Sequence, residues 1–277
     1  MFILRKRVLT AILGVPLAVY VINYGEWLFF VMILLLSLIA WKEFSAMLKR
    51  KQIPISNYTG IIGIVFLLGS AWQGNNQESM MIITLVILAV LFRVVVGNGS
   101  FTVASAAFTI MGFLYVGLPF SHLIMLRILD HDQQIMTVLG SISQGAAYLW
   151  LPFIGTWASD TFGYFVGTFL GKHKLCPIIS PAKTVEGAAG GLAGSVFGVV
   201  LVGCLFHLNT FHLVVIGLLV GFAAPAGDLV ESALKRYTGV KDSGRLLPGH
   251  GGVLDRFDSI MFAVPVVYYY IYFNVLL

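Results

Sequence analysis

The sequence predicts an all-α, polytopic integral membrane protein with about nine transmembrane helices. Of its 277 residues, 58% are hydrophobic and only 10% are charged, and the mean hydropathy is +0.93. Soluble domains are closer to half apolar and a quarter charged. Apolar runs long enough to cross a bilayer recur from end to end, and the basic residues gather beside alternate runs. Together these observations exclude an ordinary soluble domain.

The expected spans follow one another along the whole chain, and the fifth is long enough to be tilted or broken. In chain order they cover residues 8–24, 26–41, 58–73, 79–96, 101–129, 145–171, 185–206, 211–234 and 259–277. The N-terminal "LRKR" and the apolar stretch after it resemble a secretory signal. We interpret this stretch as an uncleaved first span, because no soluble domain follows it. Cys176 and Cys204 fall in a loop and a span, and predict neither a disulfide framework nor a zinc site.

Lysine and arginine predict the orientation of the chain. With a cytoplasmic N-terminus, every one of the 17 basic residues except Arg127 falls on the inner side. The outer loops "QGNNQES", "DHDQQIMTVLGSISQ" and "HLNTFH" contain none. This positive-inside pattern predicts that the N-terminus is cytoplasmic and the C-terminus is outside. The short N-terminus without a targeting extension favours the plasma (inner) membrane of a bacterium, crossed several times.

Ionisable residues divide the chain into two parts. Spans before residue 145 contain almost none, whereas those after it contain several acids at or inside their ends. These acids are Asp160, Glu186, Asp228, Glu231, Asp242, Asp255 and Asp258. Carboxylates in a membrane are costly and usually functional. We therefore expect residues 1–144 to be scaffold helices and residues 145–277 to be a catalytic region with its site on the cytoplasmic side.

The eighth span ends in "GFAAPAGDLVESALKR", which places Asp228, Glu231 and Lys235 on one helical face. A carboxylate inside a span normally faces a cavity or a cation. Pro225 and the small residues around it would let the backbone open toward such a cavity. The alternative is a purely structural ion pair between Lys235 and either acid.

The segment "PGHGGVLDRFD" adds a second acidic cluster, because Asp255 and Asp258 begin the last span three residues apart. Acids from the two spans can converge across the connecting loop, and carboxylate oxygens suit Mg²⁺. The glycines around His250 allow positive φ and could form a nest of N–H donors for phosphate. A histidine that only packs the turn is an equal alternative.

Basic residues surround these acids, as a polyanionic substrate would require. They are Lys235, Arg236, Lys241, Arg245 and Arg256. The cations alone could be positive-inside signals or a patch for anionic lipid headgroups. That alternative leaves the aspartates and the glycine turn unexplained.

Two upstream segments point to the same chemistry. In "SPAKTVEGAAGG", Ser180 is a candidate N-cap and Pro181 a first helical residue. Lys183 would then lie in the first turn, where the helix dipole disfavours a cation and a bound phosphate would relieve it. The alternative is a local Lys183–Glu186 pair. In "SDTFGYFVGTFLG", Asp160 shares a stripe with glycines that predict close helix packing.

The stretch from Ser232 to Asp258, "SALKRYTGVKDSGRLLPGHGGVLDRFD", resembles without a gap the signature of phosphatidate cytidylyltransferases, or CDP-diacylglycerol synthases. "SDTFGYFVG" and "SPAKTVEGAAGG" resemble two further blocks of that family. The resemblance implies transfer of a cytidylyl group from CTP to phosphatidate, with release of pyrophosphate. It also implies Mg²⁺, a homodimer in the lipid bilayer, and acidic metal ligands matching Asp228 and Asp255. Ala182 departs from the pattern, so any phosphate contact there is lost.

We accordingly assign expected roles to the site residues. The catalytic set is Asp228, Asp255, Lys235 and Arg256. The metal ligands are Asp228 and Asp255, with Asp258, Glu231 and Asp160 as further candidates. The substrate-binding set is Ser180, Lys183, Thr184, Arg236, Lys241, Gly249, His250, Gly251 and Gly252. The expected partners are CTP and phosphatidate, with no nucleic acid.

Rival functions predict other patterns. A transporter of an anionic or phosphorylated solute would place its charges at the bilayer midplane between inverted repeats, and no repeat is evident. A CDP-alcohol phosphotransferase would carry "DGxxAR…GxxxDxxxD", which is absent. A CTP-dependent polyprenol kinase remains an alternative as a distant relative. A structural subunit would have no use for so many intramembrane acids.

Overall fold

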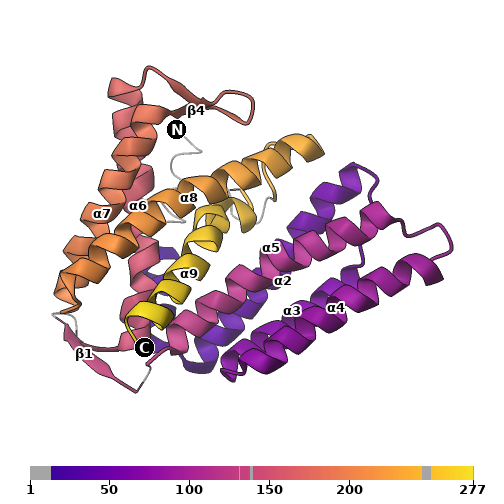
Figure 1. Cartoon of the computed structure of the whole chain (residues 1–277), viewed down its shortest axis with the longest axis horizontal. Helices are drawn as coiled ribbons and strands as arrows, with labels where there is room; N and C mark the ends of the chain where they lie inside the picture. The colour runs from indigo at the N-terminus through magenta and orange to yellow at the C-terminus, as the bar shows by residue number, and fades with distance from the viewer. Residues whose placement is uncertain (1–13, 131, 138–139, 245–250, 277) are drawn as a thin grey trace. The chain divides into compact units, whose positions relative to one another are not determined.

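A computed structural model describes residues 14–130, 132–137, 140–244 and 251–276 of the chain. The described part is predominantly helical (Figure 1). Its helices are Gly14–Tyr24, α2 (Glu26–Arg50), α3 (Asn57–Trp72), α4 (Asn76–Val96), α5 (Val103–Ile128), α6 (Gln144–Leu170), α7 (Val185–Leu205), α8 (Thr210–Thr238) and α9 (Leu254–Asn274). Each predicted span overlaps one of these helices, and α2 and α8 continue beyond the predicted ends.

Five of these helices are long and apolar enough to cross a membrane. They are Glu26–Arg50, Asn76–Val96, Val103–Ile128, Val185–Leu205 and Thr210–Thr238. Helices of this length and composition are typical of a polytopic membrane protein. The number of nine crossings and the orientation of the chain stay predictions.

Two β-hairpins correct the all-α prediction. Strand β1 (Gln134–Thr137) pairs antiparallel with β2 (Gly140–Ser143), and β3 (Lys174–Cys176) pairs antiparallel with β4 (Ser180–Thr184). Both hairpins lie in segments that hydropathy assigned to loops. The backbone N–H and C=O groups of a connecting segment need partners, and strand pairing supplies them without apolar periodicity. Hydropathy therefore could not reveal these strands.

The β3–β4 hairpin corrects the predicted helix cap before the seventh span, whereas α7 confirms the predicted start of that span at residue 185. Ser180 is not an N-cap and Pro181 is not helical, because both lie in β4, where Ser180 pairs with Cys176. Helix α7 begins at Val185, and Thr184 is its N-cap, accepting a hydrogen bond from the Gly187 N–H at 3.1 Å. Proline is tolerated in the edge strands of such a ribbon. Strand pairing therefore keeps Lys183 extended, outside the first helical turn.

Contacts divide the chain into two compact units. The first unit comprises Met1–Met125 and Lys235–Arg256, and the second comprises Leu126–Leu234 and Phe257–Leu277. The C-terminal end of α8 and the first residues of α9 therefore belong to the first unit, whereas the rest of both helices belongs to the second. The functional division at residue 144 stays a prediction.

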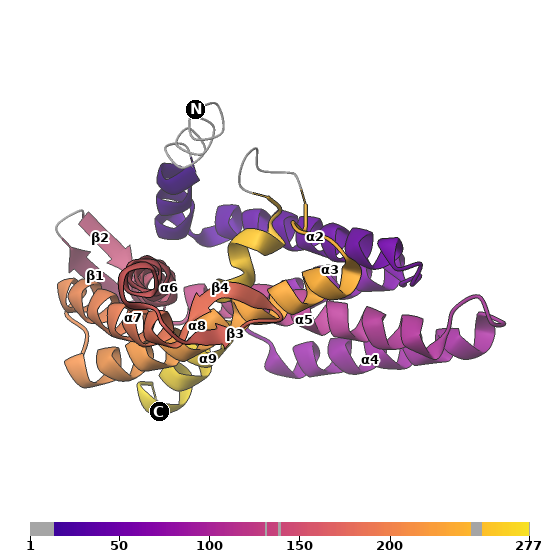
Figure 2. The same cartoon turned by 90° about the horizontal axis from the view of Figure 1, so that it is seen from above.

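In the second unit, glycines set the distance between α6 and α7, which lie side by side (Figures 1 and 2). A Cβ at Gly163 would lie 3.3 Å from the Gly187 carbonyl oxygen, and one at Gly190 would lie 2.5 Å from Val166. Helix α8 approaches α7 in the same way, since a Cβ at Gly217 would lie 2.6 Å from the backbone of Val196. The small-residue packing predicted from the sequence is therefore confirmed.

In the first unit, the buried face of α2 packs through aromatic rings. Trp41 and Phe44 are almost fully buried. Gly60 on α3 and Gly112 on α5 leave room for these two rings, because a Cβ at either glycine would overlap the ring. Glu43 lies between the two aromatic residues in the sequence and is also buried. A carboxylate on such a face needs hydrogen-bond donors.

Candidate active site

Three acids from two helices meet in the second unit. Asp228 and Glu231 on α8 and Asp258 on α9 each offer a carboxylate oxygen, and these oxygens all lie within 4.8 Å of one another. Glu231 is fully buried. The helices approach closely because residue 227 is glycine, and a Cβ there would lie 2.3 Å from the Asp258 carbonyl oxygen. This group of oxygen ligands has the chemistry of a divalent-cation site.

Lys183 extends from β4 to this acidic group. Its Nζ lies 2.7 Å from Asp228 Oδ2 and 3.4 Å from the Pro225 carbonyl oxygen. The Ser232 hydroxyl donates to the other oxygen of Asp228 at 3.2 Å. Glu186 instead accepts hydrogen bonds from the Lys172 and His173 amides and contacts His173 Nδ1 at 2.6 Å. The alternative Lys183–Glu186 pair is therefore wrong.

A pocket of about 400 Å³ adjoins this ion pair. Glycines on the facing surfaces of α6 and α7 leave the space open, because they carry no side chains to fill it. Asp160, on α6, lines the pocket together with Asp228, Lys183 and Thr184, whereas Ser180 does not. The lining residues are Ser159, Asp160, Gly163, Tyr164, Gly167, Thr168, Leu175, Ala182, Lys183, Thr184, Gly187, Ala188, Gly191, Pro225 and Asp228. The pocket thus combines acids, one ammonium group and an apolar wall.

Asp255 has a separate set of partners within the first unit. Lys235 Nζ lies 2.7 Å from its Oδ1. Its Oδ2 accepts from the Ser243 N–H at 2.9 Å, the Ser243 hydroxyl at 2.8 Å and the Gly252 N–H at 2.8 Å. Burial raises the pKa of Asp255, but Lys235 and these donors outweigh burial and lower it to about 2. Asp255 is therefore ionised at neutral pH. The convergence of Asp228 and Asp255 stays a prediction.

Lys235 pairs with Asp255, and the alternative of a structural pair between Lys235 and Asp228 or Glu231 stays a prediction. The remaining basic candidates Arg236, Lys241 and Arg256 are exposed. Arg245, Gly249 and His250 lie outside the described residues. Gly251 has a φ of +82°, which confirms the positive φ expected of this turn.

Glu43 is a residue that the sequence analysis missed. Its carboxylate accepts from the Val253 and Leu254 amides, each at 3.0 Å, and from the Ser243 hydroxyl at 3.3 Å. The side chain comes from α2, in the part of the chain predicted to be scaffold. The available signal was an acid between Trp41 and Phe44 on an apolar helix, where a carboxylate requires donors.

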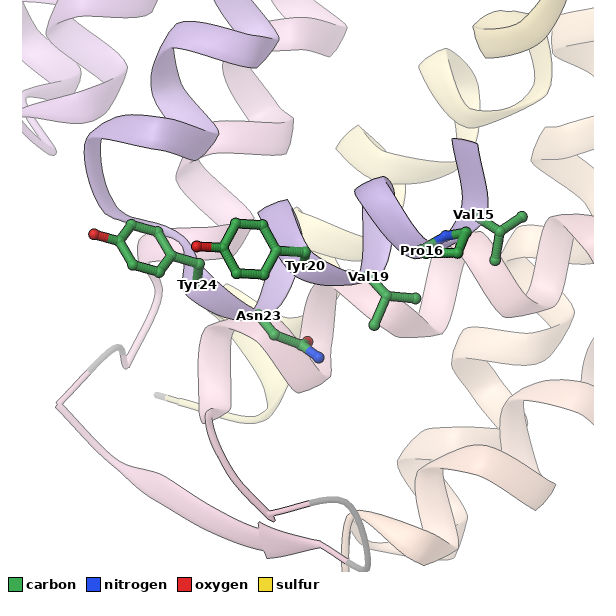
Figure 3. Close-up of a pocket in the computed structure, with 6 residues that line it drawn as sticks. All are labelled: Val15, Pro16, Val19, Tyr20, Asn23 and Tyr24. Atoms are coloured by element: carbon green, nitrogen blue, oxygen red, sulfur yellow. The ribbon is translucent and has the colours of Figure 1, made fainter. Parts of the chain in front are cut away.

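A larger pocket of about 540 Å³ lies along the helix Gly14–Tyr24 (Figure 3). It is lined by Val15, Pro16, Val19, Tyr20, Asn23 and Tyr24. All of these residues belong to one helix, and none is a carboxylate or a cation. Although it is the larger pocket, it lacks the groups that phosphate or metal chemistry needs. The pocket beside Asp228 and Lys183 is therefore the candidate active site.

Comparison with known proteins identifies the family. The model of the cytidylyltransferase family matches residues 5–274. The chain belongs to the cytidylyltransferase family. The match covers both units, so the acidic group, the Lys183 strand and the Glu43 helix all lie within the matched residues. It also confirms the resemblance that the "SALKRYTGVKDSGRLLPGHGGVLDRFD" segment carries.

Curated relatives are similar to the chain over nearly its full length. The phosphatidate cytidylyltransferase of Staphylococcus saprophyticus is 35% identical over 271 residues, which cover 95% of this chain and 97% of the relative. Those of Bacillus subtilis and Staphylococcus aureus are 34% identical over 279 and 270 residues, covering 96% and 95% of this chain and 97% of each relative.

Proposed function

We propose that the chain transfers a cytidylyl group from CTP to phosphatidate, producing CDP-diacylglycerol and pyrophosphate. An oxygen of the phosphatidate phosphate forms a bond to the α-phosphorus of CTP, and the bond from that phosphorus to the pyrophosphate oxygen breaks. The observation that supports this proposal best is the Asp228–Glu231–Asp258 group beside the pocket that Lys183 enters. The family and its relatives supply the substrate class.

No protein nucleophile is required, because phosphatidate already carries an anionic phosphate. The difficulty is to bring two phosphate groups together against their mutual repulsion. The Lys183 ammonium, already inside the pocket, would bind phosphate oxygens and offset part of that repulsion. The apolar part of the pocket wall, which includes Leu175 and Ala182, would exclude water from the reacting groups.

The acidic group fits Mg²⁺, which prefers carboxylate oxygens and substrate phosphates. Asp228, Glu231 and Asp258 would hold the ion, with Asp160 on the pocket wall as a further candidate. A bound Mg²⁺ would supply positive charge to the phosphates and to the leaving pyrophosphate.

The first unit would contribute anion binding. Asp255 holds Lys235 by an ion pair of 2.7 Å, and both side chains are largely buried. Arg236, Lys241 and Arg256 are exposed to solution, where the phosphates of CTP arrive. We assign phosphate binding to these cations and to Lys235, and a metal-ligand role to Asp255 remains part of the proposal.

We further propose that the enzyme works as a homodimer in a bacterial plasma membrane. The N-terminus would be cytoplasmic, so CTP would reach the site from the cytoplasm and phosphatidate from the inner leaflet. The positive-inside distribution of the basic residues supports this orientation.

The test is to supply purified protein in phosphatidate-containing vesicles with radiolabelled CTP, dCTP or ATP. We expect CTP-dependent, Mg²⁺-dependent labelling of lipid, none with ATP, and loss of at least about a hundredfold in Asp255→Asn. Asp242→Asn, a change of an exposed acid in the same segment, is the matched control. Equal labelling by Asp255→Asn and wild type would remove the role of Asp255, and no lipid labelling by wild type would reject the function.

A further inference from the structure

We infer that Glu43 is a positioning residue for the reaction, and this inference rests on the proposed function. Glu43 lies on α2, 212 residues before Asp255 in a chain of 277, yet it contacts the signature segment directly. The residue is 8% exposed, and its carboxylate accepts hydrogen bonds from the N–H groups of residues 253 and 254 and contacts the hydroxyl of residue 243. All of these contacts lie within the first unit.

The first contribution of Glu43 is to the N-terminus of α9. The N–H groups at the start of a helix have no partners within the helix and need other acceptors. Here the Val253 N–H donates to Glu43 Oε1 and the Leu254 N–H to Glu43 Oε2. The Gly252 and Asp255 N–H groups donate to Asp255 Oδ2 and the Ser243 hydroxyl. Glu43 thus fills the position where the start of a helix would otherwise bind an anion.

The glycines of the signature segment make room for this carboxylate. A Cβ at Gly252 would lie 2.4 Å from Glu43 Oε2, and one at Gly244 would lie 2.2 Å from Glu43 Oε1. The sequence alone suggested that Gly252 serves phosphate binding. In the structure the Gly252 N–H donates to Asp255, and the missing side chain leaves room for Glu43.

The second contribution passes through Ser243 to Asp255. The Ser243 hydroxyl lies 3.3 Å from Glu43 Oε2 and 2.8 Å from Asp255 Oδ2, so its single hydrogen is shared between the two carboxylates, with the shorter contact to Asp255. Glu43 therefore contacts both groups that fix the position of Asp255: the Ser243 side chain and the backbone just before Asp255. Since Asp255 holds Lys235, Glu43 sets the position of an acid and a cation that the proposed reaction uses.

The experiment compares Glu43→Gln with Glu26→Gln, a change of an exposed acid on the same helix. The glutamine carbonyl can accept from one amide, but its NH₂ group cannot accept from the other. We expect Glu43→Gln to lower kcat at least about tenfold, as for one lost hydrogen bond to a charged group, with KM for CTP changed by less than about threefold. Glu26→Gln should leave both constants unchanged.

Backbone hydrogen exchange measures the effect of Glu43→Gln on the structure independently of enzyme activity. In Glu43→Gln the peptide containing Val253 and Leu254 should exchange faster, whereas peptides from α7 should not change. A double-mutant cycle with Ser243→Ala should be non-additive, because both changes act on Asp255. Should Glu43→Gln not fold, Ser243→Ala alone must lower kcat severalfold and speed exchange at Asp255.

Each outcome decides the inference. Unchanged exchange at Val253 and Leu254, an unchanged kcat in Glu43→Gln, or an additive cycle would overturn it. A loss through KM alone would overturn the positioning of Asp255, because it would show that only the phosphate-binding Lys235 depends on Glu43. If the wild type made no CDP-diacylglycerol, the proposed function would fail, while the exchange data would still decide whether Glu43 holds the start of α9.

Discussion

The ion pair between Lys183 and Asp228 is partly exposed, since the two side chains are 26% and 34% exposed. Pairs this exposed contribute only about 0–1 kcal/mol to stability. The pair therefore does little to hold the fold, and its position in the pocket is what gives it importance. The carboxylates of Asp255 and Glu43 accept several hydrogen bonds from protein donors, whereas Lys183 and Asp228 can exchange partners with a ligand.

Replacing Lys183 with alanine should weaken substrate binding more than stability. We expect the apparent KM for CTP or phosphatidate to rise roughly five- to tenfold, as for the loss of one charge-assisted hydrogen bond. The melting temperature should change by only a few degrees. Lys174→Ala, an exposed lysine on β3, is the control. Steady-state kinetics with an unchanged KM for both substrates would contradict the assignment.

Acid should remove the contribution of Asp255 to stability. Its folded pKa of about 2 lies below the ordinary 3.8. The stabilisation is therefore complete above about pH 4 and is lost as pH falls through about 2. Thermal unfolding of detergent-solubilised wild type and Asp255→Asn should show a difference that is constant from pH 7 to 5 and shrinks below pH 4. A difference that grows in acid would show that the carboxylate is not stabilised as an anion.

At the scale of elements, glycines at the contacts between helices decide which side chains meet. The acids of α8 and α9 come together because Gly227 carries no side chain at the contact. The open pocket exists because the facing residues of α6 and α7 are glycines. The glycine spacing predicted close helix packing, but it did not reveal which acids the packing would join.

Gly227→Ala should separate the acidic group. Its new Cβ would lie 2.3 Å from the Asp258 carbonyl oxygen, and such overpacking typically costs about 1–3 kcal/mol. We expect the Mg²⁺ concentration for half-maximal activity to rise about tenfold or more, and the melting temperature to fall by several degrees. Gly69→Ala makes the same chemical change in α3, where nothing lies within 4 Å of the new Cβ. Identical Mg²⁺ dependence in the two variants would show that Gly227 does not position Asp258.

Two element predictions failed for a physical reason. Helical spans have a length and hydropathy that a single sequence displays, and each predicted span overlaps a helix. Short hairpins are defined by pairing between residues such as Cys176 and Ser180, and that pairing has no signal in the hydropathy of either strand. A proline after a serine is typical of a helix start, and strand pairing overrode it at Ser180 and Pro181.

At the scale of the whole molecule, each compact unit is built from two segments that are separated in the sequence. The first unit takes its signature segment from residues 235–256, far from the rest of that unit in sequence. Glu43, within the residues 1–144 that the sequence predicts to be scaffold, binds this segment through the Val253 N–H.

The predicted orientation can be tested with the two free cysteines. Cys176 is partly exposed and lies on β3, in a segment expected on the cytoplasmic side. In a Cys204→Ser background, a membrane-impermeant maleimide should label Cys176 in inside-out vesicles and not in right-side-out vesicles. Labelling only in right-side-out vesicles would invert the topology. Cys176→Ser in the same background is the control for unspecific reaction.

Composition and hydropathy by themselves determined the helical architecture typical of a membrane protein, the signature segment indicated the family, and the spacing of the acids predicted the chemical type of the site. These properties follow from residue kinds and spacings along one chain. Tertiary structure alone decided which charges became partners: Lys183 with Asp228, Lys235 with Asp255, and Glu43 with the start of α9. Those partnerships depend on contacts between distant segments, and hydropathy and helical periodicity describe each segment only by itself.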